Sequence, residues 1–246
     1  MNKKLFYLAI FIIPFLLSGQ DDDSDTSSSW EFDVAPNLWM ASLKGNIGYL
    51  DQSVPVEASF SDLLDQLSFG FMLHAEAQKD RLSIMTDLVY LKLTEDGSLT
   101  RLEVPAEAEV KQFIWELGAA YSLIKFEDYL VIDGIAGMRV FSLDPTIRVG
   151  GLVTTNEALD FIDPYFGIRF KTSSERWINS ARFDIGGLGI GSKISWKLNL
   201  LVGYKFSDLL SLYLGYQGYD VDYEGDNDFN YDMYTGGFIT GLNFHF

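Results

Sequence analysis

The stretch that decides the fold is Ser195-Trp-Lys-Leu-Asn-Leu-Leu-Val-Gly-Tyr-Lys-Phe206. Apolar side chains stand at every second position from Trp196 to Phe206. The positions between them are mostly polar or small: Lys197, Asn199, Gly203 and Lys205. A period of two residues is typical of a β-strand, because successive side chains of a strand point to opposite faces. The stretch therefore predicts a strand with one apolar and one polar face.

The same alternation recurs along the chain, in ten segments. They cover roughly residues 31–43, 69–78, 81–93, 111–123, 129–142, 165–171, 177–185, 195–206, 210–219 and 234–246. The connections between them alternate between short and long, which is the pattern of an up-and-down barrel with short turns at one end. The sequence predicts an all-β fold: a transmembrane up-and-down antiparallel β-barrel of about ten strands, with eight and twelve as the neighbouring counts.

Composition narrows the class of protein. The chain has 246 residues, of which 48% are hydrophobic, and it carries a formal net charge of −17 and no cysteine. This apolar fraction excludes a disordered chain, and the lack of cysteine excludes a disulfide scaffold or a cysteine-ligated zinc site. Phosphate binding needs a basic stripe, and none is visible. We expect no nucleic-acid partner and no cofactor.

The chain divides into three parts. Residues 1–19 have the form of a signal peptide, with Lys3 and Lys4 before an apolar core of about 13 residues, whereas a spanning helix needs roughly 20. Residues 20–29 are mostly Asp and Ser, which predicts an acidic, disordered leader. Residues 30–246 form the predicted barrel, and no later apolar run is long enough for a transmembrane helix.

Alternation alone does not say which face points outward, since a soluble lipocalin-like barrel shows it with the opposite sense. Two features favour lipid on the apolar side. The polar face is rich in small residues that suit a narrow lumen: Gly118, Ala120, Gly137, Gly167, Gly203, Gly215 and Gly241. The apolar face carries aromatic residues near strand ends, where interfacial girdles lie: Trp177, Trp196, Phe206, Phe244 and Phe246. The signal peptide supplies a route of export.

Several segments together resemble a family, the uncharacterised outer-membrane β-barrel proteins of Gram-negative bacteria. They include Ser59-Phe-Ser-Asp-Leu-Leu-Asp65, Asp163-Pro-Tyr-Phe-Gly-Ile-Arg169, Asp184-Ile-Gly-Gly-Leu-Gly-Ile-Gly-Ser192, Gly203-Tyr-Lys-Phe-Ser-Asp208 and Gly241-Leu-Asn-Phe-His-Phe246. The resemblance spans roughly residues 30–246. It implies the barrel fold and location in the cell outer membrane, and it transfers no substrate.

The same resemblance extends to the last strand, whose aromatic residues Phe244 and Phe246 are similar to the signal read by the barrel-assembly machinery. We therefore expect that machinery as a partner during biogenesis, and outer-membrane lipids and lipopolysaccharide as partners of the folded barrel.

The polar face carries seven acidic and seven basic residues. We expect a lumen network of paired charges formed by Glu76, Arg81, Asp87, Glu116, Asp133, Arg139, Arg169, Arg182, Asp184 and Lys197, with Glu31, Asp33, Lys171 and Lys205 on the same face. Pairing offsets the cost of enclosing isolated charges. The resulting prediction is a non-enzymatic, structural envelope protein whose lumen is filled by paired charges.

Two alternative functions remain open. The first is a narrow, porin-like channel for small solutes or ions, since ten strands lie well below the number of an open porin. The second is an outer-membrane hydrolase using His74, which lies on the polar face near Glu76. His245, close to the end of the last strand, is judged a poor position for catalysis at the outer face.

Two further segments have local patterns of their own. Residues 59–67 predict a short capped helix in the first outer loop, with Leu63, Leu64 and Leu67 at helical spacing; it is either an ordinary loop helix or a partial plug of the barrel. Asp220, Asp222 and Glu224 match only the opening of a calcium loop, because the twelfth position is Tyr231 instead of glutamate. They are a weak metal candidate, and we expect no metal site.

Overall fold

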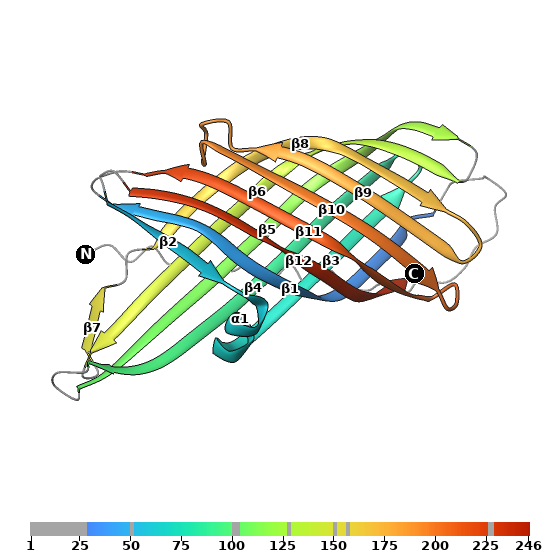
Figure 1. The fold of residues 1–246 in the computed structure, drawn as a ribbon. Coiled ribbons are helices and arrows are strands. Elements are labelled where there is room, and N and C mark those ends of the chain that lie inside the picture. The colour runs from blue at the N-terminus through green and yellow to red at the C-terminus, as the bar shows by residue number, and fades with distance from the viewer. Residues whose placement is uncertain are drawn as a thin grey trace.

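The computed structural model describes residues 29–49, 52–99, 104–126, 129–149, 152–155, 158–225 and 229–246. Ten antiparallel strands form a closed barrel (Figure 1). They are β1 (Glu31–Tyr49), β3 (Leu67–Lys79), β4 (Leu82–Leu99), β5 (Val104–Phe126), β6 (Leu130–Val149), β8 (Leu159–Ser173), β9 (Trp177–Gly186), β10 (Ile194–Lys205), β11 (Leu210–Glu224) and β12 (Phe229–His245). The predicted fold class and strand count are confirmed. The signal peptide and residues 20–28 of the leader lie outside the described residues.

The barrel closes between its first and last strands. β1 pairs with β12 from Asp33 opposite His245 to Tyr49 opposite Phe229. Two backbone hydrogen bonds between Phe32 and Phe246 extend this ladder by one further pair. Closure satisfies the backbone groups that an open sheet would leave unpaired in hydrocarbon, and it brings the two ends of the barrel sequence together at the end with the short turns.

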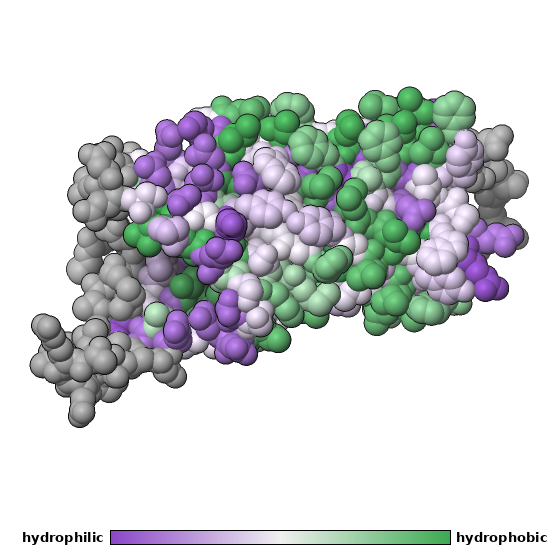
Figure 2. All heavy atoms as spheres, viewed as in Figure 1, coloured by the Kyte–Doolittle hydropathy of each residue, from purple (hydrophilic) through white to green (hydrophobic). Residues whose placement is uncertain are grey.

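The apolar face points outward. Along β8, Ile162, Phe166 and Ile168 are about half exposed, whereas the alternating Asp163 and Arg169 are buried. Figure 2 shows the hydrophobic side chains gathered over the middle and right of the barrel, with hydrophilic ones concentrated toward the left end. This arrangement, with charged residues inside and apolar residues outside, is the reverse of that in a water-soluble barrel. It is the arrangement of a membrane-spanning barrel.

The strands run further than the sequence predicts at the end opposite the short turns. β4 and β5 remain paired from Leu82 opposite Tyr121 to Leu99 opposite Val104, so four residues join them. Two additional short strands lie at this end: β2 (Gln52–Ala58), which pairs with β1, and β7 (Leu152–Thr155), which pairs with β6. The sequence analysis treated these regions as loops. It ended each strand where the apolar face ended, but backbone pairing continues into water without an apolar face.

The predicted helix is present as α1 (Phe60–Gln66). Ser59 caps it: its Oγ accepts from the Asp62 N–H, and the Asp62 carboxylate accepts from the Ser59 N–H, which forms a capping box. The helix has no buried residue and lies at the side of the barrel wall in Figure 1, so it does not plug the lumen. Among the described residues, no helix has the length and apolarity needed to cross a membrane.

Candidate functional site

The lumen contains a polar cavity of about 660 Å³ in the half of the barrel near the short turns. It reaches the rim at Lys125, Thr172 and Asp208, which lie next to those turns, and it extends inward to Arg182 and Gln217. Its wall carries residues from most of the barrel strands.

A layer of charged side chains forms the inner end of this cavity. Arg139 donates to Glu116 Oε1 at 2.9 Å and to Asp184 Oδ1 at 2.7 Å. Arg182 donates to the second oxygen of each carboxylate, both at 2.8 Å. Lys197 adds a third cation, 3.1 Å from Glu116. All five side chains are buried, and Arg139 has 0% exposure.

A second group of charges centres on Arg169. Its guanidinium holds both oxygens of Glu76, at 2.6 and 2.9 Å, and Asp133 Oδ2 at 2.9 Å. A two-point contact between arginine and carboxylate has the strongest geometry that such a pair can adopt. Asp87 links the two groups, because it lies 2.8 Å from His74 Nδ1 and 3.2 Å from Arg182.

The structure thus brings together nine of the ten residues predicted for the lumen network. Arg81 does not join them: it lies exposed in the turn between β3 and β4 and donates to the backbone oxygen of Ser122. The turn leaves its side chain at the rim, where water solvates it.

Asp163 is a buried acid that the sequence did not point to. Its carboxylate accepts hydrogen bonds from the Ser192 N–H at 2.6 Å, the Ser192 Oγ at 2.6 Å and the Ser195 Oγ at 2.7 Å. Ser195 also lies 3.4 Å from Arg139. Asp163 has the same parity on its strand as Arg169, which was the available signal, but no predicted strand reached that far toward the outer loops.

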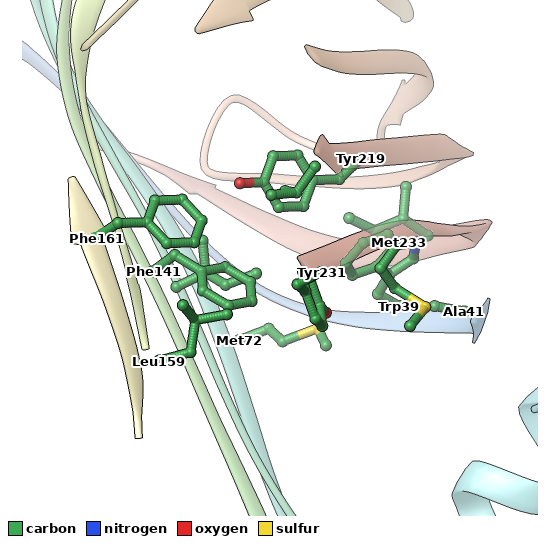
Figure 3. Close-up of a cluster of buried hydrophobic side chains, with 12 residues drawn as sticks. Trp39, Ala41, Met72, Phe141, Leu159, Phe161, Tyr219, Tyr231 and Met233 are labelled. Atoms are coloured by element: carbon green, nitrogen blue, oxygen red, sulfur yellow. The ribbon is translucent and has the colours of Figure 1, made fainter. Parts of the chain in front are cut away.

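Beyond the charged layer, the lumen is filled by apolar and aromatic side chains (Figure 3). Phe141 stacks on Phe161 with ring centroids 4.9 Å apart, and Phe161 stacks on Tyr223 at the same distance. Trp39 and Tyr219 approach from the opposite wall. The Arg139 guanidinium lies over the Tyr219 ring, 4.7 Å from its centroid, and so joins the two layers. The sequence predicted a lumen filled by paired charges and did not indicate this aromatic layer.

The candidate calcium ligands lie on a strand. Asp220, Asp222 and Glu224 belong to β11, whose extended backbone spreads them along one face. Lys193 occupies the vicinity of two of them, 3.4 Å from Asp222 and 2.8 Å from Glu224. Within the described part of the chain, no group of three His, Asp or Glu side chains is placed to hold a metal ion.

The two histidines line the same cavity in different surroundings. His74 lies between two carboxylates, with Nδ1 2.8 Å from Asp87 and Nε2 3.9 Å from Glu76. His245 lies between a carboxylate and a hydroxyl, with Nδ1 2.5 Å from Asp33 Oδ1 and Nε2 2.9 Å from Ser211 Oγ. The sequence analysis placed Asp33 on the inward face but paired neither it nor Ser211 with His245.

Solved structures with a similar fold are outer-membrane proteins. The outer-membrane protease OmpT from Escherichia coli is 12% identical with a TM-score of 0.52, over 92% of this chain and 99% of that one. Ail of Yersinia pestis is 9% identical with a TM-score of 0.40, over 88% and 99%. Neisserial surface protein A is 13% identical with a TM-score of 0.37, over 89% and 99%.

No protein-family model matches the chain, and no curated protein matches it in sequence. The resemblance found in the sequence is therefore supported for the fold and not for membership of a particular family. At 12% identity the similarity to OmpT describes architecture alone. This chain has the closed, ten-stranded, antiparallel fold of outer-membrane β-barrels.

Proposed function

We propose that this protein is a non-conducting β-barrel of the outer membrane, whose lumen is closed by stacked charged and aromatic layers. The observation that carries the proposal is the pair of buried arginines, Arg139 and Arg182, which bridge Glu116 and Asp184 across the interior. The aromatic group around Phe141 lies on the other side of this layer. The polar cavity consequently opens toward the short turns and ends at the charged layer.

The orientation follows from the strand count. Because the number of strands is even, the first and the last residue of the barrel sequence lie at the same rim, the one with the short turns. In barrels of this type that rim faces the periplasm. The apolar outer face supports a membrane location, because a belt of exposed Phe, Leu and Ile is compatible with hydrocarbon and not with water. The lumen charges act as an internal brace between strands that are distant in sequence.

Conductance distinguishes the closed barrel from the channel alternative. The closed barrel predicts no steady single-channel current from purified protein in a planar bilayer, whereas a channel predicts such a current. The double variant Arg139→Ala with Phe141→Ala removes one large side chain from each layer and should introduce conductance. A steady ohmic current from the wild-type protein would refute the closed lumen.

The hydrolase alternative that uses His74 has little support from geometry. Both ring nitrogens of His74 face carboxylates that are themselves bound by cations, and no hydroxyl in the described chain hydrogen-bonds to this ring. His74 therefore has the surroundings of a member of the charge network.

A further inference from the structure

Three inward-facing side chains near the short-turn end stand in a line across three neighbouring strands. Ser211 lies on β11, His245 on β12 and Asp33 on β1. Asp33 is opposite His245 in the closing ladder, and Ser211 is opposite Asn243, two residues before His245. The closure of the barrel therefore creates this arrangement, since Asp33 lies more than 200 residues from His245 in the sequence.

The chemistry of the three partners fits one arrangement of protons, with His245 neutral. The Asp33 carboxylate only accepts hydrogen bonds, so His245 Nδ1, 2.5 Å away, carries the proton. A neutral imidazole then leaves Nε2 as an acceptor, and the Ser211 hydroxyl at 2.9 Å donates to it. Hydroxyl, imidazole and carboxylate are thus connected in the order found in sites that activate a serine nucleophile. The ring nitrogen Nε2 faces the hydroxyl, and Nδ1 faces the carboxylate.

The surrounding backbone holds these side chains in place. The His245 N–H donates to the Leu209 carbonyl at 2.8 Å. The Asn243 side-chain amide donates to Asp33 Oδ1 at 3.0 Å, which orients the carboxylate toward the imidazole. A third group that fixes the base is part of the signature of nucleophilic sites. Placement on paired strands, as here, positions such groups more rigidly than a loop does.

The group faces a space that can hold a small molecule. Ser211, His245 and Asp33 all line the cavity of about 660 Å³ that opens at the short-turn rim. This volume lies within the roughly 300–1,000 Å³ of ordinary ligand pockets. Lys205, on the same wall, is opposite Ser211 across the β10–β11 ladder. In the structure its ammonium group donates to Ser173 Oγ on β8, at 3.3 Å, so it contributes positive charge to this cavity without touching Ser211.

We propose that Ser211, His245 and Asp33 form a serine-hydrolase site for small carboxylic esters that enter from the periplasmic end of the barrel. Ser211 and His245 are the catalytic residues, and Asp33 and Asn243 are positioning residues. This activity goes beyond the closed-barrel function proposed above. It differs from the expectation of a non-enzymatic protein, for which His245 was judged a poor position for catalysis at the outer face.

The reaction proceeds in two balanced steps. Ser211 Oγ forms a bond to the ester carbonyl carbon while its proton moves to His245 Nε2, and the carbonyl oxygen becomes an anion. The bond from carbon to the alkoxy oxygen then breaks, and the alcohol leaves with the proton from Nε2. In the second step, water gives a proton to Nε2 and its oxygen to the acyl carbon, and Ser211 Oγ leaves and takes that proton back. The products are one carboxylic acid and one alcohol.

The test uses the full barrel, refolded in detergent micelles, with p-nitrophenyl butyrate as substrate and a fluorophosphonate as covalent probe. The wild-type protein should hydrolyse the ester, and mass spectrometry should locate the phosphonyl group on Ser211. Ser211→Ala should lower kcat/KM by about 10³-fold or more, because residual activity then depends on binding and oxyanion contacts alone. Ser83→Ala, at a buried inward-facing serine that does not line the cavity, is the matched control and should leave the rate unchanged.

Asp33→Asn separates positioning from a purely structural role. It should lower kcat by about 10²–10⁴-fold with little change in KM, because the wrong imidazole tautomer is then favoured while the cavity keeps its shape. The heat-modifiable mobility of the folded barrel on gels should not change. Should Ser211→Ala fail to fold, the labelled position in the wild-type protein decides the question. A wild-type protein that leaves Ser211 unlabelled, or hydrolysis that persists in a folded Ser211→Ala variant, would overturn the proposal.

Discussion

Replacing Arg139 by methionine tests whether the lumen charges hold the barrel together. The arginine has no exposed surface, and it binds Glu116 and Asp184, both buried. Methionine fills much of the same volume but leaves the two carboxylates with fewer cations. Removing one partner of a buried ion pair destabilises a protein by about 3–5 kcal/mol.

The surrounding contacts indicate where in that range the effect falls. After the substitution, Arg182 still binds one oxygen of each carboxylate, so we expect the lower end, about 3 kcal/mol. Arg169→Met should cost more, about 5 kcal/mol, since Arg169 is the one cation bound to Asp133 within the described chain. Arg176→Met is the control, because the side chain of this exposed residue hydrogen-bonds to the Tyr204 hydroxyl and forms no ion pair within the described residues. Its effect should stay within about 0.5 kcal/mol.

The free energy of unfolding can be measured by urea titration in lipid vesicles, with heat-modifiable gel mobility reporting the folded fraction. Linear extrapolation should rank the variants as Arg176→Met, Arg139→Met and Arg169→Met in order of increasing loss. If Arg139→Met and Arg169→Met both unfolded at the urea concentration of Arg176→Met, the paired charges would not brace the barrel and the reasoning would fail.

Three further predictions concern the wall, its close contacts and the helix. Phe166→Arg, in the middle of the apolar belt, should destabilise the inserted barrel by about 2–4 kcal/mol, whereas Phe206→Arg, next to a short turn, should cost about 0–1 kcal/mol in the same vesicle titration. Gly137→Ala should impair folding, because the added Cβ would lie 2.4 Å from a backbone oxygen; Gly134→Ala, where the nearest atom is at 3.4 Å, should fold as the wild type does, and equal folding yields would contradict this. Hydrogen bonds from the serine at the N-cap lower the pKa of Asp62. The cap is therefore fully formed above the ordinary Asp pKa and is lost as the pH falls through the lowered value. Amide exchange in the helix, relative to the unfolded chain at the same pH, should accelerate only in that acidic range.

Local pattern was enough to predict the strands and to divide each one into two faces. The side-chain period of a strand is a property of two or three adjacent residues, so Trp196 and Leu198 share a face whatever the rest of the chain does. The same holds for the helix cap, since Ser59 and Asp62 bind each other's backbone three residues apart. These features need no long-range contact.

The contents of the lumen were only partly predictable. The charged residues were recognisable by their parity, whereas the aromatic layer was not. Phe161 lies beyond the predicted segment 165–171, and Phe141, although inside the predicted segment 129–142, occupies an inward position of the face described as polar. Asp163 was overlooked for the same reason as Phe161. Pattern analysis detects the membrane because the membrane selects apolar residues, and it loses the strand where water replaces lipid.

The sequence by itself determined that this chain is a barrel with an apolar outer surface and a charged interior. The pairing of the charged side chains was decided only by the tertiary structure. Arg169 binds Glu76, which lies 93 residues away in the sequence, and Asp33 contacts His245 because the last strand pairs with the first. Shifting that closing ladder by one residue would turn one of the two side chains toward lipid. Register over such separations is set by the cooperative pairing of all ten strands, and no short stretch of sequence contains it.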